Sequence, residues 1–160
     1  MWSLVGDVAL LWPQQGFLPG LVSFLLAHLA YLVAFTRAQR LAAWPPPFVA
    51  YALVAGAILA LLWPGVPGAL RAPVVAYVLC LAAMASQATV AGRAAGGRRG
   101  LGLALGGALF VASDALLATN KFAATLPLAG LWILATYWSA QWLIASWLAP
   151  PGAAVTQPPR

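Results

Sequence analysis

Residues 18–47 read LPGLVSFLLAHLAYLVAFTRAQRLAAWPPP. The first nineteen of them, 18–36, are almost entirely apolar, and the rest contain two arginines and three prolines. A helix that crosses the roughly 30 Å hydrocarbon core of a bilayer needs about 20 apolar residues. Charged residues and prolines mark the ends of such helices. This stretch therefore predicts a membrane-spanning helix followed by a polar connection.

The same alternation of apolar runs and polar breaks extends along the whole chain of 160 residues, of which 64% are hydrophobic and 6% charged. So little polar surface excludes a water-soluble globule. We expect an all-α fold, a polytopic transmembrane helix bundle that forms one domain over residues 1–148. Its six predicted segments are 2–12, 18–36, 48–63, 73–91, 101–119 and 126–148. The proline-rich residues 149–160 are expected to form a disordered cytoplasmic tail.

The first predicted segment is shorter than the others. Its eleven residues, at about 1.5 Å each, cover about half of the hydrocarbon core. Either this segment is re-entrant or it belongs to a helix that starts further upstream, and we favour the second interpretation.

The eight basic residues occur singly or in small groups between the apolar runs. This distribution is typical of membrane-flanking charges and argues against a nucleic-acid partner. When successive connections are assigned to alternate sides, six arginines fall on one side, and Arg71 and Lys121 on the other. The side richer in arginine is expected to be cytoplasmic. The composition, rich in Ala, Gly, Pro and Arg, favours a bacterial cytoplasmic membrane.

Soluble-enzyme signatures are missing from the sequence. It contains no phosphate-binding glycine loop and no nucleophile elbow. The single cysteine, Cys80, cannot form a disulfide within the chain. A metal site made by the protein alone would need both aspartates and His28, a weak signal. We therefore expect neither a metal nor a cofactor.

Asp7 and Asp114 are the only acidic residues, and both lie inside apolar stretches, VGDVALL and VASDALLA. A carboxylate there costs at least about 2.5–3.5 kcal/mol, so it normally faces a protein interior or a polar cavity. Segments 2–12 and 101–119 are predicted to run parallel, which would let both carboxylates share one cavity. A purely structural alternative is an interhelical hydrogen bond, or a pair between Asp114 and Lys121. We favour a functional role for the two acids.

Polar and aromatic residues share one face of segment 18–36. Phe24, His28, Tyr31 and Phe35 follow the i, i+4, i+7, i+11 spacing of a helix face. Tyr137 and Gln141 repeat the i, i+4 spacing in the last segment. A lone intramembrane histidine is more often a packing residue than a catalyst or ligand, and both interpretations of His28 stay open.

Two blocks of the chain resemble a known family. They are GDVALLWPQQGFLPGLVSFLLAHLAYLVAF, residues 6–35, and GALFVASDALLATNKFAATLPLAGLWILATYWSAQWL, residues 107–143. The motifs GD…F…G…F…H…Y and F…SD…N-K-F…P…T-Y-W…A-Q resemble those of the lysoplasmalogenase-like, YhhN-type membrane proteins. That family looks like an eight-helix fold with about two further helices before the first block.

The resemblance implies a lysophospholipid substrate and hydrolysis of the vinyl ether bond of lysoplasmalogens, which releases a fatty aldehyde and a glycerophospho-alcohol. This reaction needs one carboxylic acid to protonate the alkenyl carbon and one carboxylate to stabilise the cation or activate water. Asp7 and Asp114 are the expected pair, in either assignment. The expected supporting residues, which position water, hydrogen-bond the carboxylates or bind substrate, are His28, Tyr31, Ser113, Asn120, Tyr137 and Gln141.

Lys121 is either a point charge for the substrate phosphate or an interfacial lysine that reaches towards water. Two further function classes stay open. In a small transporter or lipid-binding protein, the aspartates would be proton or substrate sites. In a structural subunit, they would pair across helices.

Overall fold

The computed structural model describes residues 2–9, 12 and 16–148. The predicted tail, 149–160, and residues 10–11 at the end of the first predicted segment lie outside this part. The described residues form helices and connections without a strand. The predicted all-α fold is therefore confirmed.

Each predicted segment overlaps one α-helix. The helices are longer than the predicted segments at several ends, because glycines and charged residues continue α4 and α5 beyond their apolar runs. The elements are α1 (Trp2–Ala9), α2 (Phe17–Ala38), α3 (Pro46–Leu62), the 3-10 helix η1 (Trp63–Gly65), α4 (Gly68–Ala95), α5 (Gly97–Phe122) and α6 (Ala129–Leu148).

Four of the described helical segments are long and apolar enough to cross a membrane, so the protein is a multi-pass membrane protein. They are α2, α3 with η1, α4 and α5. Among the predicted segments, α1 is too short at eight residues. The 20 residues of α6 have the necessary length, but this helix, which contains Trp, Tyr, Gln, Ser and Thr, is not among the four.

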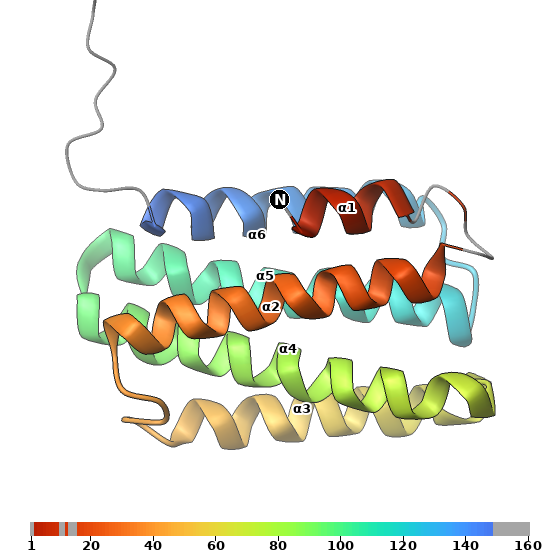
Figure 1. Ribbon diagram of the computed structural model, residues 1–160, viewed down its shortest axis with the longest axis horizontal. Helices are drawn as coiled ribbons and strands as arrows, with labels where there is room; N and C mark the ends of the chain where they lie inside the picture. Colours follow the sequence, from red (N-terminus) through yellow and green to blue (C-terminus); the bar gives the residue numbers. More distant parts are fainter. Residues whose placement is uncertain (1, 10–11, 13–15, 149–160) are drawn as a thin grey trace, which may run out of the picture.

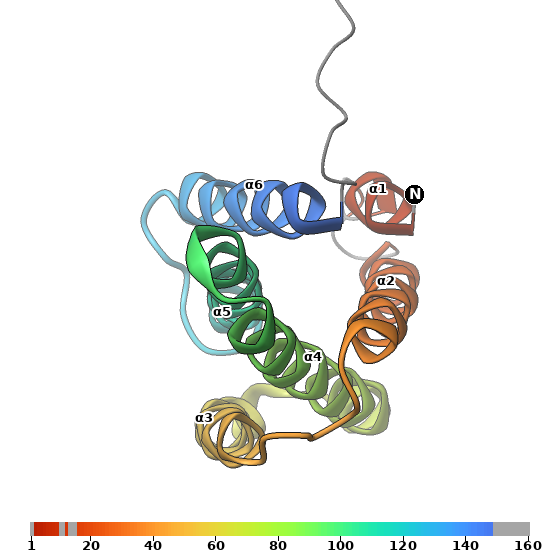
Figure 2. The same ribbon diagram turned by 90° about the vertical axis from the view of Figure 1, so that its left-hand side faces the viewer.

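Successive helices run in opposite directions along the long axis, so α1 and α5 are parallel, as the sequence predicted (Figure 1). Viewed from the end, α6, α5, α4, α2 and α1 follow one another around an arc, and α3 lies outside it (Figure 2). Along this arc each helix packs against the next, and α3 packs mainly against α4. The second helix therefore packs on α4 rather than on α3, which follows it in sequence.

Glycines bring α4 and α5 into backbone contact. The turn between them has Gly96 and Gly97 at φ values of +65° and +59°, which favour glycine. A Cβ atom on Gly92 would overlap the carbonyl oxygen of Gly100, and the reverse also holds. Further along, a Cβ on Gly107 would lie 3.1 Å from the Cβ of Ala88. Small residues thus fix the pairing of these two helices.

The connection between α2 and α3 is held by α4. The side chain of Gln87, fully buried, donates to the backbone oxygen of Gln39 at 2.7 Å. Its own oxygen accepts from the backbone nitrogen of Ala42 at 3.2 Å. The guanidinium of Arg93 lies 4.0 Å from the ring centre of Trp44. These contacts fasten the polar end of α2 to the end of α4.

Candidate functional site

Asp114 on α5 forms a hydrogen bond across the α4–α5 contact. The Tyr77 hydroxyl, on α4, donates to Oδ2 of Asp114 at 2.6 Å. The ring of Tyr77 is buried in the hydrophobic core. The close packing of α4 against α5 therefore places a phenol donor against the intramembrane carboxyl group.

Asp7 on α1 belongs to a longer chain of hydrogen bonds. The Tyr137 hydroxyl, on α6, donates to Oδ2 of Asp7 at 2.9 Å and accepts from Nε2 of Gln141 at 3.0 Å. The Tyr31 hydroxyl, on α2, donates to Oε1 of Gln141 at 2.6 Å. Ser3 interacts with the hydroxyls of Tyr31 and Tyr137. The i, i+4 spacing of Tyr137 and Gln141 thus presents both side chains to the same polar chain.

His28 packs against Tyr77 and against Phe110, which in turn contacts Tyr137. Its imidazole is fully buried, and neither ring nitrogen has a hydrogen-bond partner among the described residues. The ring lies 5.3 Å from that of Tyr77 and 4.7 Å from that of Phe110, centre to centre. Phe110 in turn lies 5.6 Å from Tyr137. A hydrogen bond from His28 to a carboxylate was one sequence expectation, but aromatic rings surround the imidazole instead.

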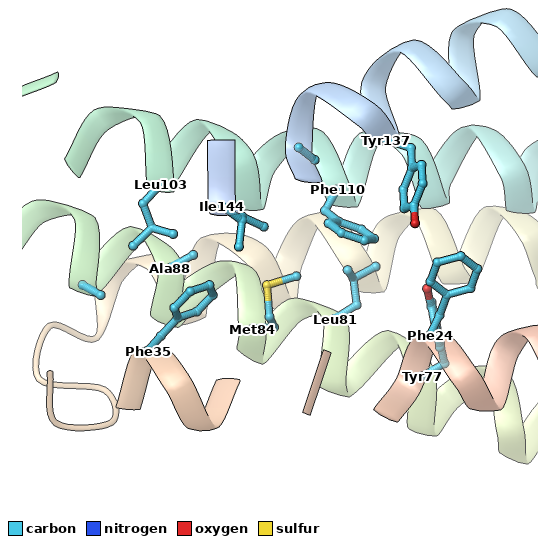
Figure 3. Close-up of a cluster of buried hydrophobic side chains, with 12 residues drawn as sticks. Phe24, Phe35, Tyr77, Leu81, Met84, Ala88, Leu103, Phe110, Tyr137 and Ile144 are labelled. Carbon is cyan, nitrogen blue, oxygen red and sulfur yellow. The ribbon is translucent and has the colours of Figure 1, made fainter. Parts of the chain in front are cut away.

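Phe24 on α2 packs next to Asp7's helix and against α6. Its ring meets that of Tyr137 edge to face at 5.9 Å. A Cβ on Gly6 would lie 2.7 Å from this ring, so a glycine beside Asp7 makes room for it. Figure 3 shows the hydroxyl of Tyr137 pointing from α6 towards Phe24 and Tyr77. Phe24 therefore lies where the two pairs approach each other.

A cavity of about 90 Å³ opens between α2, α3, α4 and α5, and Asp114 and Tyr77 supply its polar groups. Its other lining residues are apolar; Phe17, Leu62, Val66 and Phe122 lie towards one end of the bundle and Phe24, Leu81 and Val111 further in. Asp7 is not among the lining residues. This cavity therefore holds one of the two carboxylates, because Asp7 is bonded to α6 while Phe24 lines the cavity wall. That both share a cavity stays a prediction.

Three of the predicted supporting residues have contacts with groups other than the carboxylates. The Ser113 hydroxyl donates to the backbone oxygen of Ile133 at 3.1 Å, which joins α5 to α6. Oδ1 of Asn120 accepts from the backbone nitrogen of Leu126 at 2.9 Å and so holds the connection that follows α5. The Lys121 ammonium lies 5.1 Å from the ring centre of Phe17.

The described residues bring no three His, Cys, Asp or Glu side chains close enough to hold a metal ion. The considered site of two aspartates and His28 therefore has no geometric support in this part of the chain. The polar groups that do meet are carboxyl, phenol and amide groups, which can donate and accept protons. The arrangement suits acid–base chemistry beside an apolar cavity.

A sequence profile of the YhhN family matches residues 1–148. The chain belongs to the YhhN family. Curated relatives of this YhhN chain include human lysoplasmalogenase TMEM86B, 37% identical over 142 residues, which cover 89% of this chain and 58% of that protein. The Sus scrofa lysoplasmalogenase TMEM86B is 41% identical over 145 residues, covering 89% and 58%. Human lysoplasmalogenase TMEM86A is 38% identical over 149 residues, covering 91% and 61%.

This YhhN-family chain thus spans about three fifths of the length of the curated relatives it matches. No solved structure matches it. The family assignment confirms the resemblance seen in the two sequence blocks.

Sequence reasoning missed Tyr77 as a partner of Asp114 in this YhhN-family chain. The available signal was a single tyrosine in the otherwise aliphatic and small-residue segment 73–91. Periodicity alone does not show which face of this helix meets α5, because apolar residues occur on every face of the helix around Tyr77. The role of Phe110, which lies between His28 and Tyr137, was missed for the same reason.

Proposed function

We propose that this chain belongs to a membrane hydrolase that cleaves the vinyl ether bond of lysoplasmalogens, releasing a fatty aldehyde and a glycerophospho-alcohol. The relatives named lysoplasmalogenase support the substrate class. The observation that carries the proposal is the position of Asp114, hydrogen-bonded to Tyr77 in the wall of an otherwise apolar cavity. Such a cavity suits a hydrocarbon chain, and the carboxyl group supplies the chemistry.

Asp114 is the proposed general acid. In a vinyl ether, R–CH=CH–O–R′, its proton adds to the alkenyl carbon further from oxygen and produces an oxocarbenium-like cation. Water then attacks the carbon bonded to oxygen and loses a proton to a carboxylate. The resulting hemiacetal breaks its C–OR′ bond as the proton of its hydroxyl group passes to the leaving oxygen, giving R–CH₂–CHO and HO–R′. Overall, one water molecule is consumed and no redox partner is needed.

Asp7 is the proposed carboxylate that receives the proton of the attacking water. Asp7 accepts a hydrogen bond from Tyr137, and the chain of polar side chains continues through Gln141 to Tyr31. These polar groups can bind a water molecule better than the apolar cavity can. The division of roles between one acid and one carboxylate is familiar from glycoside hydrolysis, which also passes through an oxocarbenium-like state. The separate surroundings of the two aspartates support such a division.

Lys121 is the proposed contact for the substrate phosphate. Its ammonium lies against the ring of Phe17. Phe17 lines the cavity, and so does Phe122, which follows Lys121 in the chain. The cavity therefore leads from the neighbourhood of a cation to Asp114. A single-chain lipid could keep its headgroup near Lys121 while its ether linkage reaches the carboxyl group, and Lys presents a compact charge to a phosphate.

Hydrolysis of an alkenyl lysophospholipid in D₂O tests the proposed chemistry. Because the general acid protonates carbon, one deuterium should appear at C2 of the aldehyde, which is reduced at once to the alcohol so that the label is retained. Asp114→Asn and Asp7→Asn should each abolish aldehyde release. The control, Ser146→Ala, loses a hydroxyl bonded only within α6 and should keep full activity.

Active asparagine variants, or an aldehyde without label at C2, would refute the assignment. Uptake that depends on a proton gradient, without product formation, would favour the transporter alternative instead.

A further inference from the structure

His28 is a buried polar group whose environment packing alone does not explain. The imidazole is fully buried, and both ring nitrogens are without a hydrogen-bond partner among the described residues. Buried polar groups in native proteins are nearly always hydrogen-bonded, so an exception of this kind calls for a functional reason. A phenylalanine would pack against Tyr77 and Phe110 equally well at this position.

The proposed reaction leaves a proton in the wrong place after each turnover, and the following inference rests on that proposed function. Asp114 has given its proton to the substrate carbon, and Asp7 has received one from water. Before the next cycle, a proton must travel from Asp7 to Asp114. In the cavity wall, Asp114 and Tyr77 are the polar side chains, and every other lining residue is apolar. That side offers a poor route for a proton from bulk water.

The position of His28 suits this return path. On one side its ring lies 5.3 Å from Tyr77, whose hydroxyl is bonded to Asp114. On the other side Phe110 contacts both His28 and Tyr137, whose hydroxyl is bonded to Asp7. Imidazole has two nitrogens that can accept a proton at one and release it from the other. His28 is also the only histidine in the sequence.

We propose that His28 relays the proton from the Asp7 pair to the Asp114 pair and so resets the site between turnovers. The proton leaves the Asp7 carboxylic acid through the Tyr137 hydroxyl and one bridging water, which passes around Phe110. One ring nitrogen of His28 accepts it. The imidazole then turns, because neither nitrogen is bonded to Tyr77 in this structure, and the other nitrogen releases a proton to the Tyr77 hydroxyl. Tyr77 passes its own proton to the Asp114 carboxylate. Every group other than the two aspartates keeps its number of protons, and His28, left in the opposite tautomer, turns back before the next transfer.

A relay residue and a packing residue differ in their effect on the first turnover. With His28→Phe, the ring volume is kept and the nitrogens are lost. The relay predicts that mixing this variant with excess alkenyl lysophospholipid releases about one aldehyde per protein at the wild-type rate. The steady-state rate then falls by roughly a hundredfold, the scale of general acid–base contributions. Met84→Leu, another fully buried core change of similar volume, should keep both phases.

Chemical rescue provides the second arm. His28→Ala leaves space for added imidazole, which should restore the steady-state rate at least tenfold without changing the first turnover. If both phases fall together and imidazole has no effect, the relay is wrong and His28 is structural. An unchanged steady-state rate in His28→Phe would overturn it as well. If the wild-type protein itself releases no aldehyde, the proposed function fails.

A measurement on the unsubstituted protein does not depend on whether the variants fold. Protein labelled with ¹⁵N-histidine gives the ring signals of His28 alone. Filling the cavity with an uncleavable alkyl ether lysolipid should shift these signals, because the ligand then lies against Tyr77, whose ring contacts His28. Ring signals that stay unchanged at saturating ligand would contradict the relay.

Discussion

Replacement of Tyr77 by phenylalanine removes one oxygen atom from the proposed site and leaves the core packing in place. The lost group is the hydroxyl that donates to Oδ2 of Asp114 at 2.6 Å. This distance is within the range of charge-assisted O–H···O bonds. Asp114 becomes a charged carboxylate as it gives its proton to the substrate, so this bond strengthens in the transition state. Hydrogen bonds to charged groups contribute about 1.5–3 kcal/mol, and every 1.4 kcal/mol is about tenfold in rate. We therefore expect Tyr77→Phe to lower the rate of aldehyde release by roughly tenfold to a hundredfold.

The assay is the steady-state release of fatty aldehyde from an alkenyl lysophospholipid by protein in liposomes. Tyr51→Phe is the matched control, because the described residues provide no hydrogen-bond partner for the Tyr51 hydroxyl on α3. Thermal unfolding in detergent checks that the substituted ring packs as the tyrosine ring did. A well-folded Tyr77→Phe protein with the wild-type rate would refute the role assigned to this hydrogen bond.

Three further predictions concern the framework of the site. Gln141→Leu should lower the unfolding midpoint in detergent, because two partly buried tyrosine hydroxyls lose a partner at about 1–3 kcal/mol in all. An unchanged midpoint would contradict the polar chain. Gly92→Leu should destabilise the protein by more than about 2 kcal/mol, because the new side chain pushes α4 away from the backbone of α5 at Gly100. The control, Gly56→Ala, has open space around it and should change stability by under about 1 kcal/mol. Gln87→Leu should expose the α2–α3 connection to trypsin, because its backbone loses three hydrogen bonds; equal cleavage rates would show that the connection is held by other contacts.

Composition and periodicity were sufficient for the helical architecture, because lipid leaves the backbone few alternatives. They also predicted that the two aspartates would face the protein interior, and each does meet a tyrosine there. The spacing of Tyr137 and Gln141 placed them on one face, and the structure shows both in the same polar chain. Local sequence was enough for these features, because a helix fixes which residues share a face.

The relative placement of the helices could not be predicted in the same way. Whether α4 presents Tyr77 to α5 depends on small-residue contacts elsewhere along the two helices, such as those of Gly92 with Gly100 and of Gly107 with Ala88. We expected both aspartates in one cavity because their helices run parallel and place them at a similar depth in the bilayer. Depth alone does not determine which neighbouring side chain each aspartate meets. Phe24 lies near Asp7's helix and also lines the cavity of Asp114, and only packing reveals this. Ser113 was expected among the supporting residues, yet its hydroxyl donates to the backbone of α6, because consecutive helix positions point in different directions.

The central claim is that Asp114 delivers a proton to a vinyl ether held in the apolar cavity. The most direct measurement incubates the purified protein in liposomes with an alkenyl lysophospholipid and, separately, with its ester-linked analogue, and follows fatty aldehyde. We predict aldehyde from the vinyl ether substrate alone, and none from the Asp114→Asn protein. Aldehyde release that persists in Asp114→Asn, or no aldehyde from the wild-type protein with the vinyl ether substrate, would contradict the claim.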